Sequence, residues 1–213
     1  MSRQRRAAGP GGLPSCAAAS RSGRVGKAAV LALLTFALTV ALTFAFLTPS
    51  PAHAEPPPEP DGYRMDAYRA PVPATLAGAR VLDTEQAAAL WRAQKAAFVD
   101  VLPRPPRPAN LPAGTVWRDQ PRPSIPGAMW LPNTGFGALS EETEAYLRAG
   151  LGAATRGDVN APLVIFCQRE CWMSWNAAKR AIAYGYRDVS WFPEGTEGWA
   201  AAGLPLEPVE PHP

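Results

Sequence analysis

Residues 162–185 read PLVIF-CQRECWM-SWNAAKRAIAYG, and this stretch decides the fold. The run from Leu163 to Phe166 is continuously apolar and rich in β-branched residues, which is typical of a strand buried on both faces. A helical pattern begins at Ser174 and ends at Gly185, a residue type that commonly closes helices. We therefore expect a strand, a cysteine-containing loop and a helix, which is the repeating unit of α/β proteins with a parallel sheet.

The same alternation of strand and helix patterns extends along the rest of the chain. Short apolar runs predict strands over residues 79–82, 96–102, 129–131 and 189–192. Helical patterns cover residues 85–94, 140–154 and 195–202. We expect a single α/β domain whose parallel sheet is covered by helices on both faces.

A long insertion between residues 103 and 124 is dominated by proline, which excludes a helix and a central strand there. A loop of this length in a compact domain is usually functional or disordered. Its arginines are expected to be solvated, and they are Arg104, Arg107, Arg118 and Arg122.

The first 54 residues have the pattern of an export signal. Of the 21 Lys and Arg residues, six precede residue 28, and an apolar run from Ala28 to Leu47 follows them. The segment ends in Ala52-His53-Ala54, an A-x-A pattern typical of signal-peptidase cleavage. The apolar run approaches the roughly 20 residues that span a bilayer, so a retained membrane anchor is the alternative. We predict a signal peptide over residues 1–54 and a periplasmic protein.

Cleavage would leave a mildly acidic chain, with 15 Lys and Arg residues against the full 18 Asp and Glu residues, a net charge of about −3. The positive charge of the whole sequence therefore belongs to the export signal. No basic stripe with interleaved aromatic residues is present, which excludes nucleic-acid binding. We expect a Pro-rich extension over residues 55–75, the α/β domain over 76–208 and a tail over 209–213.

The few cysteines and histidines restrict the chemistry. The only cysteines beyond residue 54 are Cys167 and Cys171, and the only histidine there is His212. No internal Ser-His-Asp triad, Cys-His pair or histidine-based zinc site can therefore form. A thiol at the carboxyl end of a parallel strand lies where α/β sheets bind ligands, and loop amides and the next helix favour its thiolate. We expect Cys167 to be the reactive thiol and Cys171 the resolving one, the alternative for Cys167 being a small buried apolar residue.

These motifs resemble rhodanese domains. The unit around PLVIFC resembles the C-terminal half of the family, and FVDV, which contains Asp100, and IPGAMWLP resemble the N-terminal half. The resemblance implies a rhodanese-like fold over residues 76–208, with the persulfide-bearing cysteine at Cys167. It also implies a supporting role for Asp100 and an active-site loop made of Gln168, Arg169, Glu170, Trp172, Met173 and Ser174.

A closer resemblance covers nearly the whole mature chain. GYRMDAYRAPVP, FVDVLPRPPRP, SIPGAMWLPN and CWMSWNAAKRAIAYGY resemble the exported rhodanese-like proteins of the PQQ-dependent catabolism-associated CXXCW motif family. The resemblance implies an accessory of PQQ-dependent alcohol oxidation that acts by thiol, persulfide or disulfide chemistry. Its implied partners are a quinoprotein dehydrogenase or an exported transport component. The alternative is a non-catalytic binding module that contacts the dehydrogenase, the transporter or PQQ itself.

The loop departs from the sulfurtransferase pattern in its charge. Rhodaneses usually carry an arginine about five residues after the cysteine, where this chain has Trp172. A tetrahedral oxyanion needs an arginine fork, so this departure argues against phosphatase activity and thiosulfate sulfurtransfer. Two thiolates and Met173 could instead hold Cu(I), although core packing is the simpler interpretation of Met173.

We predict that the exported protein begins at Glu55, because the peptidase requires the small residues of the A-x-A pattern before the cut. N-terminal sequencing of the protein isolated from its compartment measures this directly. Replacing Ala54 with arginine should block processing. A wild-type chain that still begins at Met1 would instead identify the segment as an anchor.

Overall fold

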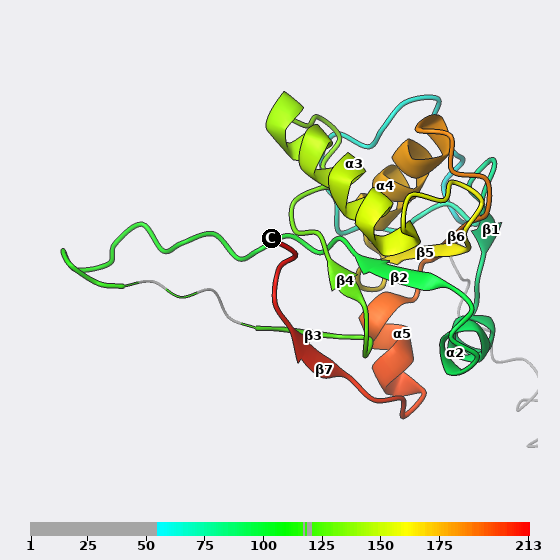
Figure 1. The fold of residues 1–213 in the computed structure, drawn as a ribbon. Coiled ribbons are helices and arrows are strands. Elements are labelled where there is room, and N and C mark those ends of the chain that lie inside the picture. Colours follow the sequence, from blue (N-terminus) through cyan, green and yellow to red (C-terminus); the bar gives the residue numbers. More distant parts are fainter. Residues whose placement is uncertain (1–54, 117, 119–120) are drawn as a thin grey trace, which may run out of the picture. The chain divides into compact units, whose positions relative to one another are not determined.

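The structure is a computed structural model that describes residues 55–116, 118 and 121–213. A five-stranded parallel sheet lies at the centre of the described domain (Figure 1). Every neighbouring pair of strands in this sheet is parallel. The order across the sheet is β1 (Arg80–Val81), β6 (Val189–Phe192), β5 (Leu163–Phe166), β2 (Ala97–Asp100) and β4 (Met129–Trp130). The predicted signal peptide lies outside the described residues.

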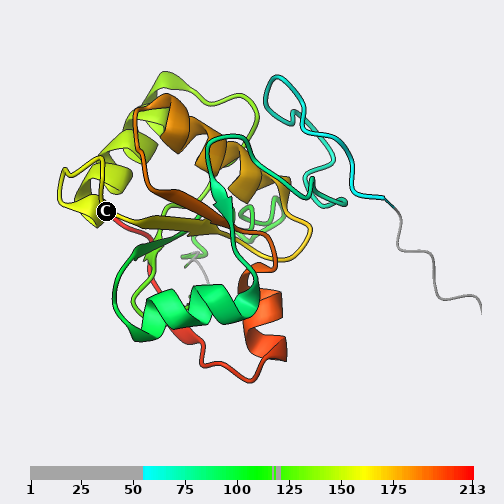
Figure 2. The same cartoon turned by 90° about the vertical axis from the view of Figure 1, so that its right-hand side faces the viewer.

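Helices cover both faces of this sheet (Figures 1 and 2). Along β5, Leu163 and Ile165 pack into one apolar cluster, and Val164 and Phe166 pack into the other. Burial on both faces explains why the strand is apolar at every position. The first cluster lies beneath α3 (Glu141–Thr155) and α4 (Trp172–Ala183), the second beneath α2 (Thr84–Arg92) and α5 (Gly195–Ala201). The expected α/β class is thus confirmed.

Aromatic side chains fill much of both clusters. Trp199 of α5 meets Trp91 edge-on at 5.4 Å and Phe98 at 6.4 Å between ring centroids. On the other face Trp175 and Trp191 are fully buried. Burying one large apolar side chain contributes roughly 1.5–3 kcal/mol. Trp175, Trp191 and Trp199 are therefore core residues.

Helix starts follow local capping chemistry. Asp83 caps α2 in a capping box with Gln86, and Ser140 caps α3 by accepting the Thr143 amide. Helix α4 begins at Trp172, two residues before the predicted start at Ser174, and its N-cap is Cys171, which makes no side-chain capping bond. A cysteine at the N-cap is a weak sequence signal, which explains the error.

A small antiparallel ribbon was not predicted. In it β3 (Arg122–Ser124) pairs with β7 (Glu207–Val209), and Pro123 lies opposite Pro208. A two-stranded ribbon tolerates prolines that a central strand would not. The chain then continues to His212, whose amide donates to the Trp130 carbonyl at 2.9 Å. The segment 209–213, predicted as a tail, is therefore attached to the edge strand β4.

The N-terminal extension lies along α4 (Figure 2). Asn176 bonds both the amide and the carbonyl of Arg64, at 2.9 Å each. Lys179 donates to the carbonyls of Pro60 and Asp61. Side chains of α4 thus hold the backbone of the extension. Within the part of the chain that the structure describes, no helix is both long and apolar enough to cross a membrane.

We predict that Gly195→Ala destabilises the protein. Gly195 has φ 51°, and a Cβ there would lie 2.6 Å from the carbonyl oxygen of Cys167 and 2.7 Å from the Cα of Gln168. Neither backbone atom can yield without moving the loop, so the free energy of unfolding should fall by about 2 kcal/mol or more.

The control is Gly152→Ala in α3, where a Cβ meets nothing within 4 Å. Helix propensity should make this variant up to about 1 kcal/mol more stable. Urea unfolding of both variants provides the comparison, and a Gly195→Ala protein as stable as wild type would contradict the close approach of α5 to the loop.

Candidate functional site

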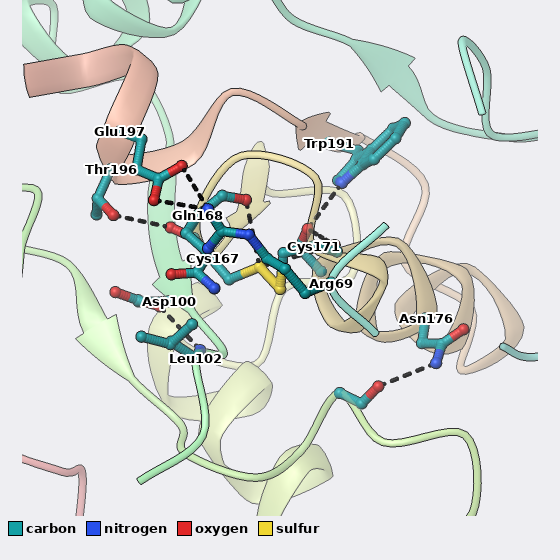
Figure 3. The surroundings of a disulfide bond; sticks show 12 residues. Arg69, Asp100, Leu102, Cys167, Gln168, Cys171, Asn176, Trp191, Thr196 and Glu197 are labelled. Atoms are coloured by element: carbon teal, nitrogen blue, oxygen red, sulfur yellow. Dashed lines mark hydrogen bonds and ion pairs between the residues drawn. A yellow bond between two sulfur atoms is a disulfide. The ribbon is translucent and has the colours of Figure 1, made fainter. Parts of the chain in front are cut away.

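Cys167 and Cys171 are joined by a disulfide at the carboxyl end of β5 (Figure 3). Their Cα atoms lie 6.5 Å apart. Cys167 directly follows the strand, and Cys171 is the N-cap of α4. Both are buried, with 0% and 4% of their surface exposed. The structure therefore brings both predicted cysteines together at the sheet edge where α/β proteins bind ligands.

The loop between the two cysteines is short. Three residues, Gln168 to Glu170, separate Cys167 from Cys171. Glu170 has φ 52°, in the left-handed region that non-glycine residues seldom adopt. The left-handed turn lies directly before Cys171, where the chain enters α4.

The backbone of Cys167 is fixed by donors from two other elements. Its carbonyl accepts from the Thr196 amide at 3.0 Å and hydroxyl at 3.2 Å, and from Arg122 Nη2 at 3.3 Å. Gln168 pairs with Gly195 in an isolated antiparallel bridge. The start of α5 and strand β3 thus hold the first cysteine of the loop, and Figure 3 shows the contact with Thr196.

The Asp100 carboxylate binds Arg122, the residue that also contacts the Cys167 carbonyl. This fully buried carboxylate accepts from Arg122 Nε at 2.9 Å, Ser124 Oγ at 2.6 Å and the Leu102 amide at 2.9 Å. Burial raises the pKa of the Asp100 carboxyl, and the charge of Arg122 and these hydrogen bonds oppose that rise. The contacts of Asp100 link β2 to β3.

The expectation that Arg122 is solvated is wrong. Only 12% of its side chain is exposed, and it connects Asp100 with the Cys167 carbonyl and the Thr196 hydroxyl. The proline-rich insertion therefore returns to the site at its C-terminal end. Sequence reasoning overlooked this contact, although a buried aspartate at a strand end requires a nearby cation.

The remaining loop residues make structural contacts. Arg169 pairs with Glu194 at 2.7 Å on the surface. The Ser174 hydroxyl donates to the Cys171 carbonyl at 2.9 Å and accepts from the Trp191 indole at 3.0 Å. Trp172 is buried, and its indole donates to the Pro71 carbonyl at 3.0 Å. These residues fix the loop to its neighbours.

Met173 belongs to the core and is 7% exposed. Its interpretation as a packing residue is confirmed. The two sulfurs are bonded to each other, so a Cu(I) site of two thiolates could form only in the reduced protein. Among the described residues, no group of three or more His, Cys, Asp or Glu is arranged to hold a metal ion.

The N-terminal extension crosses the cysteine loop. The Ala70 amide donates to the Glu170 carbonyl at 3.1 Å, and the Trp172 amide donates to the Tyr68 carbonyl at 2.9 Å. Between these two bonds Arg69 lies opposite Cys171 in an antiparallel bridge. The first amide of α4 is therefore bound to the extension, contrary to the expectation that successive loop amides point at the sulfur.

Arg69 and Glu197 are two further site residues that the sequence did not reveal. Arg69 Nη2 lies 2.9 Å from Glu197 Oε1 and 3.1 Å from Oε2. Figure 3 shows this pair beside the disulfide. No local pattern marks either residue, because the fold alone brings the extension to α5.

No protein-family model and no curated protein sequence matches the chain. Solved structures that resemble it include a thiosulfate sulfurtransferase from Pseudomonas aeruginosa, at 19% identity and a TM-score of 0.43 over 63% of this chain. The match spans 21% of that sulfurtransferase. The 30 kDa polysulfide-sulfur transferase homodimer from Wolinella succinogenes is 20% identical, with a TM-score of 0.40 over 64% of this chain and 83% of its own.

A third structure is an uncharacterized protein from Saccharomyces cerevisiae, at 18% identity and a TM-score of 0.36 over 59% of this chain and 93% of its own. These solved structures are similar to this chain in their α/β architecture, and at such identities and TM-scores they indicate nothing about its activity. The chemistry of the site has to be derived from its own geometry.

We predict that Arg122→Met strongly destabilises the protein, because it leaves the buried Asp100 carboxylate without its cation. Breaking a buried pair costs about 3–5 kcal/mol near neutral pH. The pKa of Asp100, already raised by burial, should rise further. Since the unfolded carboxyl titrates near 3.9, this deficit should shrink as the pH falls toward about 4 and Asp100 becomes protonated in both states.

The control is Arg148→Met, which removes an exposed pair with Glu144 at 2.9 Å and a stacking contact with Tyr184. It should cost at most about 1 kcal/mol. Urea unfolding at several pH values measures both variants. Equal losses in the two, with no pH dependence, would show that the Asp100–Arg122 pair is unimportant.

Proposed function

We propose that this chain is a periplasmic, thiol-active accessory protein, in which Cys167 and Cys171 form a dithiol–disulfide couple that exchanges with an exported partner protein. The observation that carries the proposal is the disulfide itself, which joins a strand-end cysteine to a helix N-cap cysteine in one loop. Other elements fix both ends of this loop, so the two sulfurs are held within bonding reach.

The exchange proceeds by two displacements. A thiolate of the partner attacks Sγ of Cys167, the Cys167–Cys171 bond breaks, and Cys171 leaves as a thiolate with the bonding electron pair. A second thiolate of the same partner then attacks the mixed disulfide and releases Cys167. The protein gains two electrons, and the partner dithiol becomes a disulfide.

Helix α4 favours Cys171 as the leaving group. Cys171 is its N-cap, and the first turn of the helix contains no acidic residue. The positive end of a helix stabilises a thiolate and lowers the pKa of its thiol. The sequence pattern favours the thiolate on Cys167, at the end of the strand. The position of Cys171 supports the reverse order, with the covalent adduct still formed on Cys167.

The same pair can handle sulfane sulfur. When the reduced Cys167 thiolate attacks the terminal sulfur of a polysulfide, the polysulfide S–S bond breaks, the shortened polysulfide leaves with the bonding electron pair, and Cys167 carries a persulfide. The Cys171 thiolate then attacks Sγ of Cys167, forms the disulfide and releases hydrosulfide. The protein thereby consumes the persulfide and returns to the disulfide form.

Oxyanion chemistry has no support in the arrangement of charges. Arg169 is paired with Glu194, and Arg122 is paired with Asp100. A phosphate or thiosulfate group needs a cationic fork directed at it. Neither arginine offers one while it is held by a carboxylate.

The biological setting follows the sequence resemblance. We assign the protein to PQQ-dependent alcohol oxidation, with a quinoprotein dehydrogenase or an exported transport component as the exchanging partner. One observation favours the second candidate, a non-catalytic module that binds the dehydrogenase, the transporter or PQQ. Both sulfurs are buried beneath the extension, as expected of a structural disulfide.

We predict that a reduced Cys171→Ser variant accumulates one covalent adduct on Cys167 when challenged with polysulfide or glutathione disulfide. The resolving thiolate is missing, so the adduct cannot be displaced. Intact-protein and peptide mass spectrometry locate it. The matched Cys167→Ser variant should accumulate little, because Cys171 is the better leaving group and the thiolate released in the first step attacks the adduct and displaces Cys171 again.

Failure of Cys171→Ser to form any adduct would sink the thiol-exchange proposal. The binding-module candidate would then take its place. The binding-module candidate predicts that a strain carrying Cys167→Ser still grows on the alcohol substrate.

A further inference from the structure

We propose that Arg69 of the N-terminal extension is a charge-stabilising residue of the reactive site, which covers the disulfide while paired with Glu197 and pairs with the Cys171 thiolate after reduction. The proposal rests on the proposed thiol function and names the group that controls it. Arg69 thus supplies from outside the loop a cation that the loop lacks at Trp172.

Backbone pairing fixes where the Arg69 side chain lies. The two hydrogen bonds beside Arg69 and Cys171 run from Ala70 to Glu170 and from Trp172 to Tyr68. This pattern makes Arg69 and Cys171 a non-hydrogen-bonded antiparallel pair, whose side chains lie close together on one face. Figure 3 shows Arg69 beside the two sulfurs on that face.

The present ion pair of Arg69 can be exchanged. Its guanidinium contacts both carboxylate oxygens of Glu197, but the two side chains are 53% and 43% exposed. Pairs with this exposure are weakly held, because water and salt compete for both charges. A thiolate formed on Cys171, the residue opposite Arg69 in the bridge, is a competing anion for the same guanidinium.

The other cations around the loop have partners of their own, and among the described residues none of these cations is paired through its backbone with Cys171 as Arg69 is. Behind Cys167, Arg122 is bound to Asp100, and beside it Arg169 is bound to Glu194. Arg64 lies over the Trp172 ring at 5.2 Å and donates to the Asp66 carbonyl.

Glu170 and Glu197 are the nearby carboxylates that oppose a thiolate. The Tyr68 hydroxyl donates to the Met65 carbonyl. Arg69 is therefore the cation placed opposite Cys171.

The test measures the Cys171 thiol alone, in the mature chain with the Cys167→Ser substitution. The rate of alkylation by iodoacetamide is followed against pH, which gives the midpoint of thiolate formation. Adding Arg69→Met should move the midpoint upward by about one unit, so that the neutral-pH rate falls about tenfold. Arg69→Lys should restore most of the loss.

Glu197→Gln should move the midpoint the opposite way, because it removes the competing carboxylate from Arg69. The matched control is Arg80→Met. Arg80 pairs with Asp188 at 3.3 Å with nearly the same exposures, 56% and 44%, but on β1 and away from the loop. This control should leave the midpoint unchanged, and it removes the same amount of positive charge.

An unchanged midpoint in Arg69→Met, or an equal shift in Arg80→Met, would overturn the proposal. Faster alkylation at every pH with no shift would also overturn it, since Arg69 would then be a steric cover only. Failure of the thiol function itself has a different signature. In that case the parent midpoint would already lie at about 8.5, the value of an unperturbed thiol.

Discussion

The ion pair between Asp100 and Arg122 is the contact on which the geometry of the site depends. A buried carboxylate is tolerable only when its oxygens are satisfied, and three donors satisfy this one. Two of the donors come from β3, so the proline-rich insertion must return to the end of β2. The same guanidinium then reaches the Cys167 carbonyl and Thr196. The position of the cysteine loop is thus coupled to the satisfaction of a buried charge.

Local signals were enough to predict most of the sheet and its helices. The runs that became β2, β5 and β6 are apolar because both of their faces are covered, and that pattern is visible in the sequence without any contact information. Asp83 and Ser140 mark helix starts through bonds to their own neighbours. The two cysteines could be placed on one loop for the same reason, since a strand and a helix flank them directly.

Contacts between distant parts of the chain could not be predicted in this way. The pairing of β3 with β7, the approach of Arg122 to Asp100 and the crossing of Arg69 over Cys171 each join segments far apart in sequence. None has a periodic pattern, and β3 even contains a proline, which argues locally against a strand. A buried aspartate requires a nearby cation, but this requirement did not specify which of the four arginines of the proline-rich insertion would pair with Asp100.

The buried disulfide places opposite demands on its surroundings in its two redox states. A disulfide carries no charge, so the extension can cover it at little electrostatic cost. A thiolate in the same position must have a cation or water close by. The extension is held by backbone bonds to the loop, by Asn176 and Lys179 of α4, and by Tyr68, Ala70 and Val72, which pack against the apolar cluster. Arg69 can meet the second demand without any opening of the extension, because it lies opposite Cys171 and its ion pair with Glu197 is exposed to solvent.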